Sequence, residues 1–210
     1  MKSRVRPLGF FRNQEPSSSA VISDCGKYRY LLKRKIRAGH TWRAVLFIML
    51  NPSTADEHEN DPTIRKCMYY AERWGFDELV VANLFALRSP EPSYLYTSPH
   101  DPIGPDNKEH LENAVYDVVK RYSPFKISGI RDGIVVCGWG KDGNYMDQGE
   151  TVLGWLENIP VRPYFLQKNL DGTPTHPLYL KKSLEPKLWT PWDSDDITEY
   201  DDSCYGSEDE

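Results

Sequence analysis

One stretch of this chain is apolar from end to end: residues 44–50, with the sequence AVLFIML. A half-exposed strand alternates apolar and polar residues, whereas a strand that is apolar throughout is typical of a parallel sheet covered by helices on both faces. Similar runs follow at residues 79–87 and 134–137, the first of them interrupted only by Asn83. The chain is therefore predicted to build its core around a parallel sheet.

Helical patterns separate these runs. Asp61 and Pro62 are typical of the start of a helix, apolar residues follow at helical spacing, and Gly75 is typical of its end. The other predicted elements are helices over 106–122 and 149–157 and strands over 27–36 and 162–166. This alternation predicts an α/β fold, a three-layer α/β/α sandwich with a central, mostly parallel sheet of four to five strands. In such folds ligands bind beyond the carboxyl ends of the strands.

The 210 residues are enough for one domain with a core of its own. We predict a basic flexible arm over 1–23, a single α/β domain over 24–190 and an acidic, disordered tail over 191–210. Basic residues dominate up to Arg43, although the net charge of the whole chain is −5. A nucleic-acid-facing basic surface explains this asymmetry. A solvated charged edge strand beside a disordered tail explains it too, as does a tail that folds back on the basic face.

Several classes of protein are excluded by what the sequence lacks. No apolar run approaches the roughly 20 residues of a membrane-spanning helix, and the N-terminus lacks the apolar stretch of a secretory signal. The four cysteines are scattered without a CxxC pair, which argues against a zinc site and against disulfides and fits free thiols in a reducing cytoplasm. We therefore expect a cytoplasmic protein with no membrane partner, no metal and no cofactor.

A glycine-rich segment follows the third apolar run. It reads Gly138-Trp139-Gly140-Lys141-Asp142-Gly143 and fits the spacing GxGxxG. The dinucleotide fingerprint belongs in the first strand–helix turn of its domain, with an acidic residue about 20 positions later, whereas this segment follows the third strand and Asp171 lies too far on. A glycine loop that lets a ligand or a phosphate approach the backbone is the better interpretation.

Polar residues gather where the first apolar run ends. Asn51 offers an amide, Ser53 and Thr54 offer hydroxyls, and Asp56 offers a carboxylate. Such groups at one strand end can hold a water or a ligand oxygen. The alternative is a plain turn, because Asn-Pro begins turns and Ser, Thr and Asp cap helices.

Two further residues are candidates for binding or catalysis. Asn83 lies inside an apolar run, and its amide can both donate to and accept from the edge of a base. The alternative is an amide that satisfies the backbone at a strand end. His176 stands before Pro177 in a loop and can donate a hydrogen bond to a developing oxyanion. The alternative is an ordinary surface histidine.

Seven blocks of this sequence, in order, resemble the family catalogued as domain of unknown function 1643. They are Tyr28-Arg29-Tyr30, residues 50–56, Asp61-Pro62-Thr63, residues 83–88, residues 102–107, Gly138-Trp139-Gly140 and residues 176–180. The resemblance covers roughly residues 24–180 and implies no established activity.

A more distant likeness carries more chemistry. In the uracil-DNA glycosylase superfamily a buried strand ends in Gly-x-Asn-Pro-Gly, a second carries a base-reading Asn, a third ends in Gly, and His-Pro-Ser comes late. The chain is similar, with Leu50-Asn51-Pro52-Ser53, Asn83, Val136-Cys137-Gly138 and His176-Pro177-Leu178 in that order. The resemblance implies the same α/β/α sandwich, here called uracil-DNA glycosylase-like.

The resemblance also implies roles for these residues. Asn51 or Asp56 would position a water against the sugar carbon, Asn83 would read the base edge, and His176 would stabilise negative charge on the departing base. Phe85 or Trp139 could stack on the base. The other residues implied at the substrate are Ser53, Thr54, Arg88, Gly138 and Gly140.

The chain departs from the glycosylase pattern at several positions. Ser53 stands where glycosylases have a Gly near the sugar, and Leu178 replaces the Ser after His-Pro. Asp61-Pro62-Thr63 and Arg65 have no counterpart. These departures leave a different base, a free nucleotide or a non-nucleotide ligand open.

The sequence thus supports the hypothesis of a glycosylase-like protein that binds a nucleobase or nucleotide. It would hydrolyse an N-glycosidic bond in DNA or in a nucleotide, with water as the nucleophile and the basic N-terminal segment on the phosphates. Two alternatives stay open: a non-catalytic module for nucleic acid or modified nucleotides, and a hydrolase or transferase for a small polar metabolite. The glycosylase hypothesis predicts that Asn51, Asp56, Asn83 and His176 line one cleft, and it fails if His176 points away from Asn51.

Overall fold

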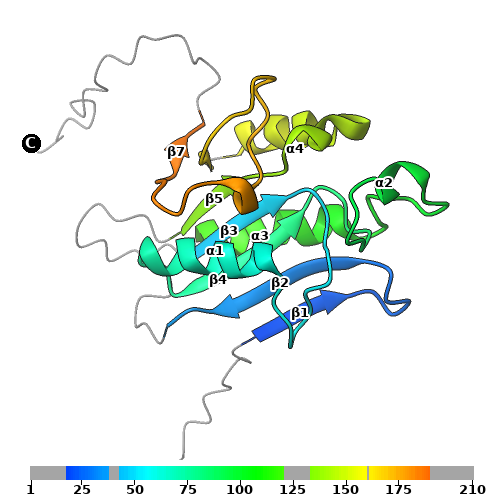
Figure 1. Ribbon diagram of the computed structural model, residues 1–210, viewed down its shortest axis with the longest axis horizontal. Helices are drawn as coiled ribbons and strands as arrows, with labels where there is room; N and C mark the ends of the chain where they lie inside the picture. Colours follow the sequence, from blue (N-terminus) through cyan, green and yellow to red (C-terminus); the bar gives the residue numbers. More distant parts are fainter. Residues whose placement is uncertain (1–17, 38–42, 121–132, 160, 190–210) are drawn as a thin grey trace, which may run out of the picture.

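The computed structural model describes residues 18–37, 43–120, 133–159 and 161–189 (Figure 1). The strands are β1 (Ser18–Ile22), β2 (Arg29–Lys35), β3 (Ala44–Met49), β4 (Glu78–Asn83), β5 (Gly133–Cys137), β6 (Pro163–Phe165) and β7 (Lys187–Leu188). The helices are α1 (Pro62–Arg73), α2 (Tyr94–Thr97), α3 (Asn107–Lys120) and α4 (Gln148–Glu157), with 3-10 helices η1 (Lys141–Asp147) and η2 (Pro177–Tyr179). The acidic tail and most of the N-terminal arm lie outside the described residues.

One sheet of seven strands runs through the described part of the molecule, in the order β1-β2-β4-β3-β5-β6-β7. Its centre is parallel, because β3 pairs in parallel with both β4 and β5, and β5 with β6. The outer pairs β1–β2, β2–β4 and β6–β7 are antiparallel. The expected α/β fold with a parallel centre is confirmed, whereas the expected number of strands was too low.

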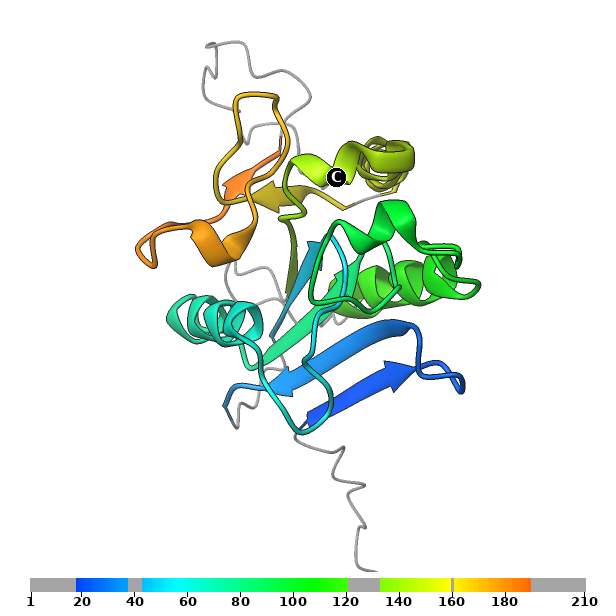
Figure 2. The ribbon, with the colours of Figure 1, turned by 45° about the vertical axis from the view of Figure 1, so that its right-hand side comes forward.

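Helices cover both faces of the sheet, as the apolar runs predict. All six residues of β3 are buried. Leu46 and Ile48 pack in the cluster that includes α3 and α4, whereas Val45 and Phe47 pack in the cluster that includes α1. Figure 2 shows α1 on one side of the strands and α3 on the other. Successive side chains of a strand point to opposite faces, so a strand covered on both faces has no position for a polar residue.

The start of α1 agrees with the sequence. The Asp61 carboxylate accepts a hydrogen bond from the backbone N–H of Ile64 at 2.8 Å, and Pro62 is the first helical residue. Gly75 follows the helix with φ of +80°, a left-handed conformation that glycine adopts without steric cost. The Asp61 cap fixes the far end of the loop between β3 and α1, and this loop begins with Leu50 and Asn51.

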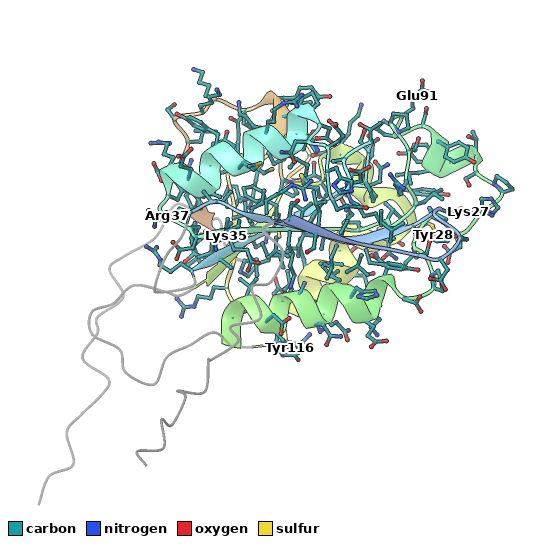
Figure 3. The ribbon with its side chains drawn as sticks, turned by 90° about the horizontal axis from the view of Figure 1, so that it is seen from below. Lys27, Tyr28, Lys35, Arg37, Glu91 and Tyr116 are labelled. Atoms are coloured by element: carbon teal, nitrogen blue, oxygen red, sulfur yellow. The ribbon has the colours of Figure 1, made fainter. Side chains whose placement is uncertain are left out.

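Several local expectations are corrected. Residues 18–22, expected within a flexible arm, form β1 and pair with β2. The strand over 27–36 is therefore internal rather than an edge, as Figure 3 shows from the β1–β2 side. The apolar run 79–87 leaves the sheet after Asn83, and Leu84 and Phe85 continue only with single hydrogen bonds to the end of β3. The short elements α2, η1, η2 and β7 had no periodicity long enough to detect.

Candidate functional site

A cavity of about 640 Å³ lies beyond the carboxyl ends of β3 and β5. Four segments of the chain line it: the end of β3, the loop before α2, the start of η1 and the loop between β6 and η2. Its lining residues are Leu50, Asn51, Pro92, Trp139, Gly140, Lys141, Asp142, Asn169, Leu170, Asp171, Thr175, His176 and Tyr179. The cavity is in the position where parallel α/β sheets bind their ligands.

Asn51 enters the cavity with its amide already oriented. Its Nδ2 donates to the carbonyl oxygens of Ser89, at 3.0 Å, and of Pro52, at 3.2 Å. Both donors are thus used by the backbone, whereas Oδ1 makes no hydrogen bond to a described residue. An amide held in this way offers a fixed acceptor, which can orient a water or a ligand hydroxyl.

His176 lines the same cavity as a neutral imidazole. Burial lowers the pKa of His176 to about 4, and the charge of Asp61 opposes this only in part. Nδ1 accepts a hydrogen bond from the backbone N–H of Leu178 at 3.4 Å. Nε2 is consequently the nitrogen that carries the proton, because a neutral imidazole has one donor and one acceptor. The ring can donate from Nε2 without carrying a charge.

Glycines set the packing of Trp139 at the floor of the cavity. Trp139 is only 2% exposed. An ideal Cβ on Gly143 would lie 1.9 Å from Trp139 Cδ1, and one on Gly149 would lie 2.9 Å from Nε1. Side chains at these two positions would displace the indole, so the glycines make room for it. The GxGxxG spacing here serves packing in addition to any contact with a ligand.

Gly138 and Gly140 bring the His176 turn close to the end of β5. A Cβ on Gly138 would lie 2.9 Å from Pro177 Cδ, which is closer than real Cβ atoms approach. Gly140 has φ of +77° and donates its N–H to Pro174 at 2.8 Å. These contacts join two segments that are far apart in sequence, and they place His176 opposite the end of β3.

Charged side chains stand at the cavity from two loops. The hydroxyl of Tyr96 in α2 donates to Asp142 Oδ1 at 3.0 Å. Burial and this carboxylate raise the pKa of Tyr96 to about 12, so the phenol remains a donor. Asp171 Oδ1 accepts from the hydroxyl of Thr173 at 2.6 Å and from its N–H at 3.0 Å. These bonds, with the nearby charge of Lys141, lower the pKa of Asp171.

Of the four side chains expected in one cleft, Asn51 and His176 line the cavity, and Asp56 and Asn83 do not. Asp56 Oδ1 instead accepts from the backbone N–H groups of His58 and Glu59, both at 2.9 Å. These hydrogen bonds lower the pKa of Asp56. Its carboxylate closes a turn, which is the alternative that the sequence had left open for this segment.

Asn83 is fully buried at the end of β4, level with Met49 of β3. Neither atom of its side-chain amide has a hydrogen-bond partner within the described part of the chain. Its backbone carbonyl accepts from Asn107 Nδ2 at 3.0 Å. An unpaired buried polar group costs on the order of 1–3 kcal/mol. The Asn83 amide therefore does not satisfy the backbone at the strand end, which was the alternative role that the sequence had left open for it.

The remaining expected binding residues take other positions. Ser53 is half-buried and Thr54 exposed, and neither lines the cavity. Phe85 is fully buried, with its ring 5.6 Å from the ring of Tyr145. Arg88 donates to the Gly26 carbonyl at 3.3 Å. Their roles at a substrate stay predictions, while Trp139 and Gly140 line the cavity with Asn51 and His176.

Two arginines of the basic segment are structural. Arg29 is 1% exposed, and its Nη1 donates to the Ala55 carbonyl at 2.6 Å. Arg34 is 4% exposed and donates to the Asp56 and Glu59 carbonyls. Burial lowers the pKa of Arg29 to about 10. These side chains hold the loop after Asn51 onto β2, so they do not belong to a solvated edge.

Sequence patterns did not indicate every lining residue. Asn169, Asp171 and Thr175 lie in an irregular loop, and Tyr179 ends the short helix η2, so only their nearness to His176 could have indicated them. Tyr96 reaches Asp142 from α2, a contact between residues 46 positions apart. Among the described residues, no group of three or more His, Cys, Asp or Glu side chains could hold a metal ion. No described helix is long and apolar enough to cross a bilayer.

One family model, with the description protein of unknown function (DUF1643), matches residues 29–178, from the first residue of β2 into η2. The match includes every lining residue of the cavity except Tyr179. No curated protein and no solved structure matches the chain.

Proposed function

The chain belongs to the DUF1643 family, and because that description assigns no activity, we propose one from the site. The cavity binds a nucleobase with its attached sugar, and the protein hydrolyses the N-glycosidic bond with water as the nucleophile. The observation that carries this proposal is that Asn51 and His176, from loops 125 positions apart, line one cavity together with Trp139.

The bonds change as follows in the proposed reaction. The bond between the sugar carbon C1′ and the base nitrogen breaks, and its electron pair leaves with the base. A water oxygen forms a bond to C1′, and the proton that this water loses ends on the base. The products are the free sugar end and the free base, and no oxidant or reductant is needed.

Asn51 and His176 suit the two ends of this reaction. Asn51 Oδ1 accepts a hydrogen bond from the attacking water, because both Nδ2 hydrogens are held by the Ser89 and Pro52 carbonyls. His176 donates from Nε2 to the base as negative charge develops. A donor that is already neutral and fixed stabilises such charge without reorganisation at the moment of reaction. Trp139 supplies an apolar wall for the base.

The fold belongs to the same proposal. A uracil-DNA glycosylase-like α/β/α sandwich is proposed here on the order of the motifs along the chain, and nucleic acid, nucleotides and nucleosides are the ligands that this order leaves open. Helices on both faces of a sheet with a parallel centre are compatible with that arrangement. Asn83 remains a proposed base reader whose amide would need to become accessible, since it is now fully buried.

Release of free base is the direct test. Nucleosides, nucleotides and oligonucleotides with natural and modified bases are incubated with the full chain, and the free base is separated by chromatography. We expect Asn51→Ala and His176→Ala to lower the rate by roughly 10²- to 10³-fold. His58→Ala is the matched control, because His58 is exposed and outside the cavity lining.

The outcomes separate the proposal from its rivals. Base release that falls in both cavity variants and not in His58→Ala supports hydrolysis at this site. Ligand binding without base release from any substrate overturns the hydrolysis and leaves a binding module. Release that is unchanged in both cavity variants shows that the chemistry is not in this cavity.

A further inference from the structure

We propose that the cavity takes an unphosphorylated ribonucleoside rather than a nucleotide or a nucleic-acid strand. This inference rests on the proposed function, because it names the substrate class of the same site. It is carried by the hydrogen-bond acceptors and the charges of the cavity lining. A base needs the same apolar wall in all three ligands, so the groups around the sugar and phosphate decide among them.

Two carboxylates offer acceptors for sugar hydroxyls. Asp142 and Asp171 line the cavity from different loops. Each is held through one oxygen, Asp142 Oδ1 by the Tyr96 hydroxyl and Asp171 Oδ1 by Thr173. The second oxygen of each makes no hydrogen bond to a described residue. An ionised carboxylate only accepts, and ribose hydroxyls are the donors that such carboxylates recognise next to a base.

The charge of the lining disfavours phosphate. Two carboxylates oppose a single ammonium, that of Lys141, among the lining residues. The charge of Lys141 already acts on Asp171, whose pKa it helps to lower. The imidazole of His176 is neutral because its pKa lies at about 4. A phosphate dianion would thus meet surplus negative charge, and a partly enclosed site screens that repulsion less than open water does.

The arginines of β2 and of the segment just after it do not make up this deficit. Arg29 and Arg34 are buried against loop carbonyls, and Arg37 is paired with Asp77 at 2.9 Å. Figure 3 shows Lys35 and Arg37 at one end of β2, with Glu91, the neighbour of Pro92 in the cavity lining, at the other end. Lys27 lies at the same end as Glu91. Affinity for nucleic acid comes mainly from many cations on phosphates, and the cavity lining holds one, Lys141.

Calorimetric titration of the full chain tests the ligand class. The probes are adenosine, guanosine, cytidine and uridine, each beside its 2′-deoxynucleoside and its 5′-monophosphate, with single- and double-stranded oligonucleotides as further arms. We expect at least one ribonucleoside to bind about tenfold more tightly than its own 5′-monophosphate and than its 2′-deoxy form.

A charge variant makes the test specific. Asp142→Asn keeps an oxygen for Tyr96 but removes the negative charge, so the preference for nucleoside over monophosphate is expected to shrink by about fivefold or more. Glu91→Gln is the matched control, because its exposed carboxylate lies beside the cavity without lining it. This control should leave the preference unchanged.

The outcomes distinguish a failure of the ribonucleoside inference from a failure of the proposed hydrolysis. A monophosphate or oligonucleotide that binds more tightly than every nucleoside overturns the ribonucleoside inference, and base release from it would leave the proposed hydrolysis standing. Tight nucleoside binding with no base release supports the inference on ligand class and overturns the hydrolysis. An absence of binding by every probe overturns both.

Discussion

Asn51 and His176 differ in how the protein uses their polar atoms, and this difference sets their chemistry. The backbone occupies both donors of Asn51 and leaves its acceptor, whereas it occupies the acceptor of His176 and leaves its donor. The pair therefore presents one fixed acceptor and one fixed donor to the same cavity. Neither property follows from the residue type alone, because each depends on which atoms the surrounding loop has taken.

The protonation of His176 gives the first prediction at the scale of the residue. Its pKa of about 4 in the folded protein lies below the ordinary histidine value of 6.5. The unfolded chain therefore binds the proton more readily, and stability is lost as the pH falls from 6.5 to 4, by up to about 3 kcal/mol. We expect the imidazole NMR signals of His176 to stay constant between pH 6 and 8, with the proton on Nε2.

Denaturation of wild type and His176→Gln at several pH values isolates this contribution. The wild type should lose more free energy of unfolding than the variant between pH 6.5 and 4. Equal losses in both proteins, or an imidazole that titrates near pH 6.5, would show that the folded environment does not suppress its protonation.

The elements that carry the site are held by contacts that sequence periodicity does not record. η1 begins at the cavity with Lys141 and Asp142, and Gly143 within it packs under Trp139. Met146 and Asp147, the last two residues of η1, both have positive φ, near +54°, without being glycine. Such a conformation costs roughly 1 kcal/mol per residue, and α4 begins directly after this strained pair.

A pair of glycine variants gives a prediction at the scale of the element. Gly143→Ala should destabilise the protein by roughly 1–3 kcal/mol, because its Cβ would lie 1.9 Å from Trp139 Cδ1. Gly154→Ala is the control in α4, where a Cβ meets nothing within 4 Å. This control should stabilise the helix by roughly 0.5–1 kcal/mol.

Urea denaturation measures both effects, and tryptophan fluorescence reports whether the indole has moved. Ligand affinity should fall in Gly143→Ala and stay constant in Gly154→Ala. A Gly143→Ala protein with wild-type stability would mean that Trp139 can vacate its position at no cost.

At the scale of the whole molecule, antiparallel strands extend the parallel centre of the sheet at both edges. β1 covers β2 along its length, and Ser18 Oγ also donates to the Glu57 carbonyl in the loop before α1. The first strand therefore supports both the sheet and the loop that begins at Asn51. The folded unit therefore begins at residue 18 if β1 contributes to stability, and after residue 22 if it does not.

Two truncations test that boundary. A chain that starts at Ser18 keeps every described contact, whereas a chain that starts at Ser23 lacks β1 and leaves β2 as an unpaired edge. We expect the second chain to unfold roughly 5–10 °C lower. It should also associate at high concentration, because an uncovered strand edge pairs with other chains. Equal melting temperatures for the two chains would show that residues 18–22 do not stabilise the fold, as expected of a flexible arm.

The sequence by itself determined the parallel centre of the sheet. Runs such as residues 44–50 have no polar position, and only a strand covered on both faces accommodates them. It also determined the start of α1, because Asp61 and Pro62 act on the backbone within one helical turn. These features depend on residues a few positions apart, so a local pattern is enough to reveal them.

Tertiary structure alone decided which candidates share the cavity. Asn51, Asp56, Asn83 and His176 looked equivalent as polar residues near strand ends, yet only Asn51 and His176 line it. The Asp56 carboxylate accepts hydrogen bonds from two neighbouring backbone N–H groups, and Asn83 is fully buried at the end of β4. Contacts such as Tyr96 with Asp142 join residues far apart in the chain. Their geometry depends on how loops pack, which no local pattern encodes.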